Sequence, residues 1–315
     1  MTVDDARGIR ANEEGSEGIV SVRYRGIIPP MVTPFDEREE IDIRALQGEA
    51  EYLIGVGCTA LTVGGSTGEG AGFSPEEVRA AVRAVATQTR GRVPVIAGAI
   101  PDTTREAVSL GKGAREAGAD ALQVTPPHYL FPPGPDDTVE YYRTIGQAVG
   151  LPIVVYNVVP WATIDVPTLV RLLDLPNVAG VKQSGGDIHK LSELLHAARG
   201  KASILTAVDD LLYPSFVLGA DGAVAAILTA VPTLCVALFD AVQRGDHTAA
   251  LQIHNRLVPV WMALSGPNLP ARVKAALKLQ GRHGGRSRRP MSVPSGEDVS
   301  MIQEALERAE LVTVA

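Results

Sequence analysis

One lysine interrupts an otherwise apolar, strand-like run of the sequence. Lys182 lies in Val-Ala-Gly-Val-Lys-Gln at 178–183, whereas the other lysines fall in segments with helix or loop patterns. Apolar surroundings disfavour an ammonium group and favour a neutral amine, which can attack a carbonyl carbon. The carbinolamine then loses water to give an iminium, an electron sink for bond cleavage or formation at the adjacent carbon. The alternative is a strand-end lysine that reaches solvent or pairs with Asp209.

Two further groups of polar residues follow strand-like runs. Tyr156 ends the run 152–157, and its phenol could relay protons during formation of the carbinolamine or serve as an ordinary half-buried core residue. Ser66 and Thr67 precede Gly68 in a turn whose hydroxyl and N–H groups can converge on a carboxylate. The turn lacks the Gly-Lys-Ser/Thr sequence that ends a phosphate-binding P-loop, and its glycines lack the Gly-x-Gly-x-x-Gly spacing of a dinucleotide-binding loop. We therefore predict no nucleotide site at this turn.

Eight such runs must position these side chains. They are rich in Val, Ile, Leu and Ala, alternate with helix-like segments, and cover 26–33, 60–65, 93–98, 121–127, 152–157, 178–183, 203–208 and 222–228. Near-continuous apolar strands that alternate with helices indicate a parallel sheet buried on both faces. Helix starts are marked at Ser74 with Glu77 and at Thr103 with Glu106, both capping-box patterns.

The pattern predicts an α/β protein, a (β/α)₈ TIM barrel over 24–245 with a helical C-terminal extension over 246–315. The acidic, polar residues 1–23 are expected to form a flexible tail. Active sites of such barrels lie at the carboxyl ends of the strands. One mouth would therefore collect Ser66, Tyr129, Tyr156, Lys182 and Asp209.

Four motifs in this order resemble the dihydrodipicolinate synthase and N-acetylneuraminate lyase family. They are Gly-Ser-Thr-Gly-Glu at 65–69, Tyr-Asn-Val at 156–158, Gly-Val-Lys-Gln-Ser-Gly-Gly-Asp at 180–187 and Leu-Gly-Ala-Asp-Gly at 218–222. The resemblance extends from about 26 to 311. It implies a class I lyase or aldolase that binds pyruvate or a related 2-oxo acid as an imine on Lys182 and joins it to, or releases it from, an aldehyde. No metal and no organic cofactor are implied.

The resemblance also assigns roles to residues. Gly65, Ser66 and Thr67 would hold the pyruvate carboxylate, and Tyr156 would relay protons. Tyr129 would match a second relay tyrosine that reaches into the neighbouring subunit's site, or His128 would take that place if the alignment is not shifted by one residue. This implies a homo-oligomer, a dimer of dimers. Further substrate contacts are expected from Trp161, Ser184, Asp209, Asp210 and Ala225.

One departure from the family pattern bears on the second substrate. Trp161 stands where dihydrodipicolinate synthases place an arginine that receives the carboxylate of the aldehyde, and an indole cannot replace that bidentate pairing. We therefore expect a less charged or partly aromatic aldehyde. Asp209 and Asp210 could instead bind a polyol, while Ala225 lacks the hydroxyl used by sialic acid lyases. The alternatives are 4-hydroxy-tetrahydrodipicolinate synthase itself, a Schiff-base dehydratase or deaminase of a 2-oxo sugar acid, and a non-catalytic binding barrel.

The composition excludes several other classes of protein. With 315 residues, 45% of them hydrophobic, and a formal charge of −7, the chain is globular and unsuited to binding nucleic acid. Cys58 and Cys235 form neither a metal cluster nor a disulfide framework, which favours a reducing, cytoplasmic location. The apolar run 222–239 is split by Pro232, so no membrane span is predicted. The basic run 281–289 is expected to be a solvated connection.

Overall fold

Eight parallel strands form the centre of the molecule. The computed structural model describes all residues except 1–21, 130, 199 and 313–315, so the predicted tail lies almost entirely outside the described residues. The strands are β1 (Gly26–Ile27), β2 (Leu61–Val63), β3 (Val95–Ala99), β4 (Ala121–Val124), β5 (Ile153–Asn157), β6 (Val178–Gln183), β7 (Ser203–Thr206) and β8 (Gly222–Ala223). Seven fall within a predicted run, and β3 extends one residue beyond its run, to Ala99.

The sheet closes on itself. Neighbouring strands follow the order β1-β8-β7-β6-β5-β4-β3-β2, and every pairing is parallel. A parallel bridge between Pro30 and Thr62 joins the first segment to the second, with Met31 N–H donating to the Thr62 carbonyl at 2.9 Å. The predicted (β/α)₈ barrel is confirmed.

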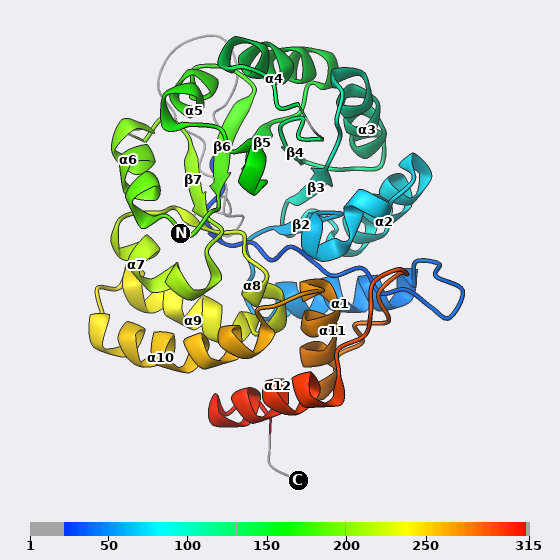
Figure 1. Ribbon diagram of the computed structural model, residues 1–315, viewed down its shortest axis with the longest axis vertical. Helices are drawn as coiled ribbons and strands as arrows, with labels where there is room; N and C mark the ends of the chain where they lie inside the picture. The colour runs from blue at the N-terminus through cyan, green and yellow to red at the C-terminus, as the bar shows by residue number, and fades with distance from the viewer. Residues whose placement is uncertain (1–21, 130, 199, 313–315) are drawn as a thin grey trace.

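Helices surround the strands and extend beyond them at the C-terminal end (Figure 1). Those around the barrel are α1 (Ile43–Gly55), α2 (Pro75–Thr89), α3 (Thr104–Glu116), α4 (Pro135–Val149), α5 (Val166–Leu173), α6 (Ile188–Ala198), α7 (Leu212–Val217), α8 (Ile227–Ala230) and α9 (Pro232–Gln243). The C-terminal part consists of α10 (His247–Leu264), α11 (Leu269–Leu279) and α12 (Gly296–Arg308). Short 3-10 turns η2 (Ser66–Gly68), η3 (Gly70–Gly72), η4 (Pro160–Ala162) and η5 (Asp209–Leu211) follow strands.

The predicted helix starts are present with one difference. Ser74 and Glu77 form a complete capping box at the start of α2. Thr103 caps α3 through the Glu106 N–H, but the Glu106 carboxylate accepts from the N–H of Asp102 instead of closing the box. Each cap satisfies N–H groups that have no partner within the helix.

The barrel interior has its own apolar layer, separate from the larger core between sheet and helices. It consists of Tyr24, Ile28, Ala60, Ile96, Ala121, Val154, Leu205 and Val224. Alternate residues of a strand share a face. The side chains two positions further along β2, β4 and β5, those of Thr62, Gln123 and Tyr156, therefore also face the interior, nearer the carboxyl ends. Lys182 pairs in register with Tyr156 and completes this polar level.

The apolar run 222–239 folds as β8, α8 and α9, with Cys235 and Leu238 fully buried in the core. In the part of the chain that the structure describes, no helix is both long and apolar enough to cross a membrane.

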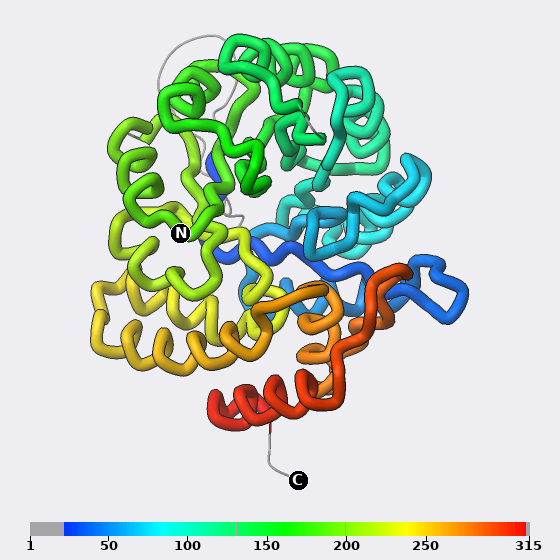
Figure 2. Tube along the Cα trace, viewed as in Figure 1, coloured from blue at the N-terminus to red at the C-terminus, as the bar shows by residue number. Residues whose placement is uncertain are grey.

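The basic run 281–289 is not a solvated connection, and that prediction is wrong. Arg282 forms a buried ion pair with Glu49, and Arg288 pairs with Glu77 at 2.5 Å. The backbone of Arg286 bridges to Phe35, so the loop after α11 lies beside the hairpin near residue 36 (Figure 2). The physical reason is charge: carboxylates from several N-terminal elements face this loop, and its arginines neutralise them.

Candidate active site

Lys182 and Tyr156 lie together at the carboxyl ends of β6 and β5. The Lys182 nitrogen is 4.2 Å from the centre of the Tyr156 ring. Lys182 is 4% exposed and Tyr156 is 1% exposed. The electron-rich face of the ring therefore packs against the lysine nitrogen. The alternative of a lysine that reaches solvent is thereby ruled out by its burial.

The Tyr156 hydroxyl joins the lysine to the glycine-rich turn after β2. It donates to Ser66 Oγ at 2.9 Å and accepts from the Ser66 N–H at 3.3 Å. Burial alone would raise the pKa of Tyr156, but the Lys182 charge and the hydrogen bonds with Ser66 and Lys182 lower it below its ordinary value. A phenol with a lowered pKa transfers its proton more readily, as a proton relay requires.

Close backbone packing shapes this turn. A Cβ atom on Gly68 would lie 2.8 Å from the Met31 carbonyl oxygen, and one on Gly70 would lie 1.8 Å from that of Gly64. Only glycine fits at these two positions. Between them, Glu69 adopts a left-handed conformation with φ of 59°. Its carboxylate is held by the Lys274 ammonium at 2.5 Å and by the Arg288 N–H at 2.9 Å.

Asp209 adds an acidic group to the same end of the barrel. Its carboxylate accepts from the Ile227 N–H at 2.8 Å at the start of α8. Burial raises the pKa of Asp209 to about 6, although that hydrogen bond and the Lys182 charge both oppose the shift. A carboxyl group that titrates near neutrality close to an amine can supply or accept a proton.

The comparisons with known proteins agree with this geometry. Residues 23–309 match the model of the dihydrodipicolinate synthetase family. The chain belongs to this family. Members are pyruvate-dependent lyases and synthases, so the protein is an enzyme of the lyase class, and the resemblance seen in the sequence is confirmed.

Individual relatives cover nearly the whole chain. The 4-hydroxy-tetrahydrodipicolinate synthase of Nitrobacter hamburgensis is 35% identical over 92% of this chain and 98% of the relative, and that of Archaeoglobus fulgidus is 33% identical over 92% and 100%. Among solved structures, the dihydrodipicolinate synthase of Aquifex aeolicus has a TM-score of 0.86 at 30% identity, covering 91% of this chain and 99% of that one. A prophage member of the family from Escherichia coli K12, solved with pyruvate, has a TM-score of 0.86 at 27% identity, covering 91% and 99%.

The remaining predicted site residues of this family member differ in burial. Thr67 is buried beside Ser66 in η2, and Ala225 is buried just after β8. Ser184 is half-buried and donates its N–H to the Asn157 carbonyl at 3.1 Å. Asp210 is exposed. The structure therefore groups Lys182 with Tyr156 and Ser66 and leaves the contacts of these other residues with substrate as predictions.

The two candidates for the second relay differ in exposure. Tyr129 is 72% exposed, and its N–H donates to Asp102 at 2.9 Å. His128 is half-buried, and its Nδ1 lies 3.4 Å from Oδ1 of Asp102. It also lines a pocket beside Ser66. Only Tyr129 extends from the surface, as a residue that reaches another subunit must.

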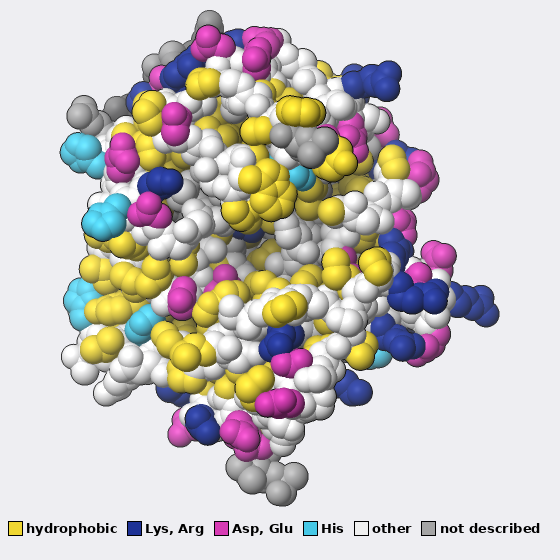
Figure 3. Space-filling model, viewed as in Figure 1, with side chains coloured by type: hydrophobic (Ala, Val, Ile, Leu, Met, Phe, Trp, Pro, Cys, Tyr) yellow, Lys and Arg dark blue, Asp and Glu magenta, His cyan; other side chains and the backbone are white. Residues whose placement is uncertain are grey.

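A pocket of about 430 Å³, here called the mouth pocket, opens beside Ser66. Its walls are mostly apolar and include Ala71, Ile100, Val158, Val159, Pro160, Trp161, Pro270, Pro290 and Met291. Hydrophobic side chains gather around a hollow near the centre of this face of the molecule (Figure 3). Trp161 is 69% exposed, and its indole N–H donates to the His128 carbonyl at 2.9 Å, which fixes the ring across the β4 and β5 loops.

The charged residues of the mouth pocket all have partners. Arg288 pairs with Glu77, and Arg289 pairs with Glu39. Glu69 pairs with Lys274. Among the described residues that line this pocket, no arginine is left free to replace the one that Trp161 displaces.

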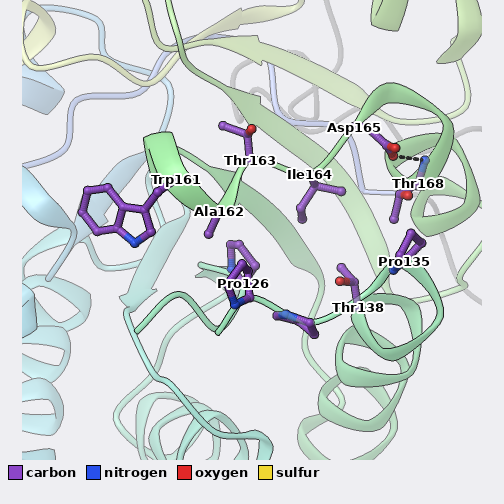
Figure 4. Close-up of a pocket in the computed structure, with 11 residues that line it drawn as sticks. Pro126, Pro135, Thr138, Trp161, Ala162, Thr163, Ile164, Asp165 and Thr168 are labelled. Atoms are coloured by element: carbon purple, nitrogen blue, oxygen red, sulfur yellow. Dashed lines mark hydrogen bonds between the residues drawn. The ribbon is translucent and has the colours of Figure 1, made fainter. Parts of the chain in front are cut away.

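A second hollow of about 240 Å³ lies behind Trp161 and contains none of the reactive side chains. It is lined by prolines and by residues 161–165, and Asp165 within it caps α5 through the Thr168 N–H (Figure 4). Figure 4 shows Trp161 at one side of this hollow and Asp165 at the other. The mouth pocket is therefore the candidate substrate entrance.

Metal ligands do not cluster in the described part of the chain: no three of its His, Cys, Asp or Glu side chains are arranged to hold an ion.

Sequence reasoning missed two polar side chains at the lysine level and the residues contributed by the C-terminal loop. Thr62 and Gln123 are buried inside the barrel. Gln123 breaks an apolar strand as Lys182 does, so the same pattern could have identified it. Nothing local predicts that Arg288 and Met291 line the mouth pocket.

Proposed function

We propose that the protein forms a covalent imine between Lys182 and pyruvate or a closely related 2-oxo acid. The observation that carries the proposal is the contact of buried Lys182 with buried Tyr156, whose hydroxyl bonds to Ser66 in the turn after β2. An amine, a proton relay and an anion-binding turn thus lie next to one another. Ser66 and Thr67, with the N–H groups of the turn that begins at Gly65, bind the carboxylate. The carbonyl carbon is then presented to Lys182.

The residues support each step. The neutral Lys182 amine attacks C2 of the 2-oxo acid, and Tyr156 passes a proton to the carbonyl oxygen, which leaves as water. Loss of a proton from C3 gives an enamine, whose C3 bonds to the carbonyl carbon of an aldehyde while the aldehyde oxygen takes up a proton. Water then hydrolyses the imine and frees Lys182. The reverse sequence cleaves the same bond. The chain's own residues suffice for these steps, so we propose no cofactor.

Reduction with borohydride tests the proposal directly. The intact protein, incubated with pyruvate and then reduced, should gain the mass of one reduced pyruvate adduct per chain. Lys182→Ala should gain none, and Lys190→Ala, which removes a lysine from α6, should behave as wild type. An adduct that persists in Lys182→Ala would refute the assignment of the nucleophile.

For the second substrate we propose an aldehyde that carries no carboxylate and has an apolar or aromatic tail. The support is the mouth pocket: apolar walls, a fixed indole at Trp161, and arginines already paired with Glu77 and Glu39. An acidic aldehyde would leave its charge unpaired there, which costs more than burial of its carbon chain returns. An aromatic ring would stack on the indole and remove apolar surface from water.

A panel of aldehydes, scored by pyruvate consumption, separates these possibilities. Benzaldehyde-type aldehydes should be consumed faster than the acidic aspartate semialdehyde, and a polyol aldehyde should lie between them. If the acidic aldehyde is preferred, the protein is instead a 4-hydroxy-tetrahydrodipicolinate synthase, the activity named for its relatives. Consumption of a 2-oxo sugar acid without any aldehyde would indicate a dehydratase or deaminase.

We further propose a homo-oligomer, arranged as a dimer of dimers, in which Tyr129 of one subunit completes the relay of another. The exposed aromatic side chains of Tyr129 (72%) and Phe131 (84%) next to the site support this arrangement. Mixing inactive Lys182→Ala with inactive Tyr129→Phe should then restore part of the activity, because hybrid dimers contain one complete site. No restoration would indicate that each chain works alone. A cytoplasmic location stays a prediction and is consistent with two buried free cysteines.

A further inference from the structure

Gln123 is fully buried inside the barrel, yet its amide has no hydrogen-bond partner. Its side chain is 0% exposed, and neither Nε2 nor Oε1 bonds to any residue that the structure describes. An unpaired amide in such a place costs stability, and an apolar residue of similar length would avoid this cost. A buried polar group without a protein partner points to a ligand or to a functional need.

The position of Gln123 places this amide at the carboxylate-binding turn. Gln123 on β4 pairs with Gly98 on β3, and a Cβ on Gly98 would lie 2.6 Å from the Gly65 nitrogen. No side chain therefore separates Gln123 from the turn. A Cβ on Gly65 would lie 3.7 Å from the Tyr156 hydroxyl and 3.8 Å from Gln123 Nε2, so the phenol and the amide approach the same glycine.

Further unpartnered polar side chains lie near this amide, and one of them also lines the mouth pocket. Thr125 directly follows β4, two residues beyond Gln123. It lines the mouth pocket, and its hydroxyl also lacks a partner among the described residues. The Thr62 hydroxyl on β2 is buried and unpartnered in the same way. Unpaired polar groups are thus concentrated where the inner face of the barrel meets the turn.

We propose that Gln123 is a further substrate-binding residue, whose amide donates a hydrogen bond to the carboxylate end of the 2-oxo acid held at the Ser66 turn. The inference rests on the proposed function. A carboxylate accepts about four hydrogen bonds, and the N–H and hydroxyl of Ser66 are already hydrogen-bonded to the Tyr156 phenol. The Gln123 amide supplies a donor from the barrel side and gains the partner that the protein itself does not provide.

The length-matched variant Gln123→Met tests this proposal. Pyruvate affinity, measured by calorimetry, should fall about 10-fold or more, because hydrogen bonds to a charged group are among the strong ones. Methyl pyruvate, which lacks the carboxylate charge, should bind equally to both proteins. The melting temperature without ligand should stay unchanged or rise. Gln183→Met is the matched control for stability: Gln183 is also buried, but its amide bonds to Asn157 and Ser184, so the melting temperature should fall.

Each outcome decides the question. Unchanged pyruvate affinity in Gln123→Met overturns the proposal, and equal weakening of pyruvate and methyl pyruvate shows that the amide acts on the site and not on the carboxylate. Should Gln123→Met fail to fold, Gln123→Asn, which keeps the amide but withdraws it by one carbon, must still weaken pyruvate binding. If wild type forms no borohydride-trapped adduct, imine formation is refuted but the role of Gln123 is not. Calorimetry measures binding of the carboxylate whether or not an imine forms.

Discussion

The Lys182 nitrogen lies 4.2 Å from the centre of the Tyr156 ring, while the hydroxyl of the same ring bonds to Ser66. One phenol therefore contacts both the proposed nucleophile and the turn proposed to bind the carboxylate. Any movement of the turn on binding a carboxylate changes the hydrogen bonds of the phenol that serves the amine. Binding of the 2-oxo acid and proton transfer are thus linked through a single side chain.

Replacing Tyr156 with phenylalanine should slow imine formation by about 100-fold or more, the usual range for loss of a positioned proton relay. The ring beneath Lys182 is kept, so pyruvate binding should change little. Trapping with borohydride at successive times after addition of pyruvate gives the rate of imine formation. Tyr142→Phe is a matched control: its buried hydroxyl bonds only to the Val124 carbonyl, so it should cost about 1 kcal/mol of stability and leave the rate unchanged. A normal rate in Tyr156→Phe would remove this residue from the mechanism.

Asp209 should make stability and activity depend on pH near 6. Its folded-state pKa is raised from 3.8 to about 6, so the fold favours the protonated carboxyl. This contribution to stability is complete below pH 3.8 and is lost as the pH rises through 6. The free energy of unfolding of Asp209→Asn, relative to that of wild type, should therefore rise by about 1 to 3 kcal/mol when the pH is raised from 4 to 7.5. Urea unfolding at both pH values measures the difference, and parallel stability curves for the two proteins would contradict the assignment.

Lys182 could be singled out from the sequence because a polar residue within an apolar strand is a local pattern. Lys182 and Gln123 both show this pattern, but only the amine has an obvious covalent chemistry, so sequence reasoning alone selects the lysine. The strands and their order were predictable for a similar reason: alternating apolar runs and capped helices are local features, and parallel pairing follows from them.

The role of the basic loop could not be predicted in this way. Arg282 is paired with Glu49, which lies 233 residues earlier, and Arg288 with Glu77, 211 residues earlier. Local composition is the same for a solvated loop and for one that neutralises distant carboxylates. Only the closed fold brings these partners together, and with them the C-terminal wall of the mouth pocket.

The buried ion pair between Glu69 and Lys274 should hold the carboxylate-binding turn in place. Both side chains are under 10% exposed, and Lys274 also donates to the Arg286 carbonyl at 2.6 Å. Lys274→Met leaves the Glu69 charge unpaired and should cost about 3 to 5 kcal/mol of stability, with weaker pyruvate binding. Adding Glu69→Gln should recover part of the stability, as urea unfolding would show.

An exposed ion pair provides the control for this measurement. Lys201 and Asp174 are also 2.6 Å apart, but their side chains are 46% and 60% exposed. Lys201→Met should therefore cost less than about 1 kcal/mol and leave pyruvate binding unchanged. Equal losses in Lys201→Met and Lys274→Met would show that burial of the Glu69 pair has no special importance.

Trp161→Arg should change which aldehyde the enzyme accepts. A guanidinium at this position of η4 would face the mouth pocket without a carboxylate partner of its own, since Glu39 and Glu77 are already paired. It can then pair with an acidic aldehyde, and kcat/KM for aspartate semialdehyde should rise about 10-fold or more relative to that for an aromatic aldehyde.

Trp161→Phe serves as the control, because it keeps an apolar wall and should retain the aromatic preference. The ratio of the two kcat/KM values, not either value alone, is the relevant measurement, since loss of the indole bond to His128 slows both reactions together. An unchanged ratio in Trp161→Arg would mean that the aldehyde does not contact residue 161. Imine formation at Lys182 would then be unaffected, because in the proposed mechanism it precedes aldehyde binding.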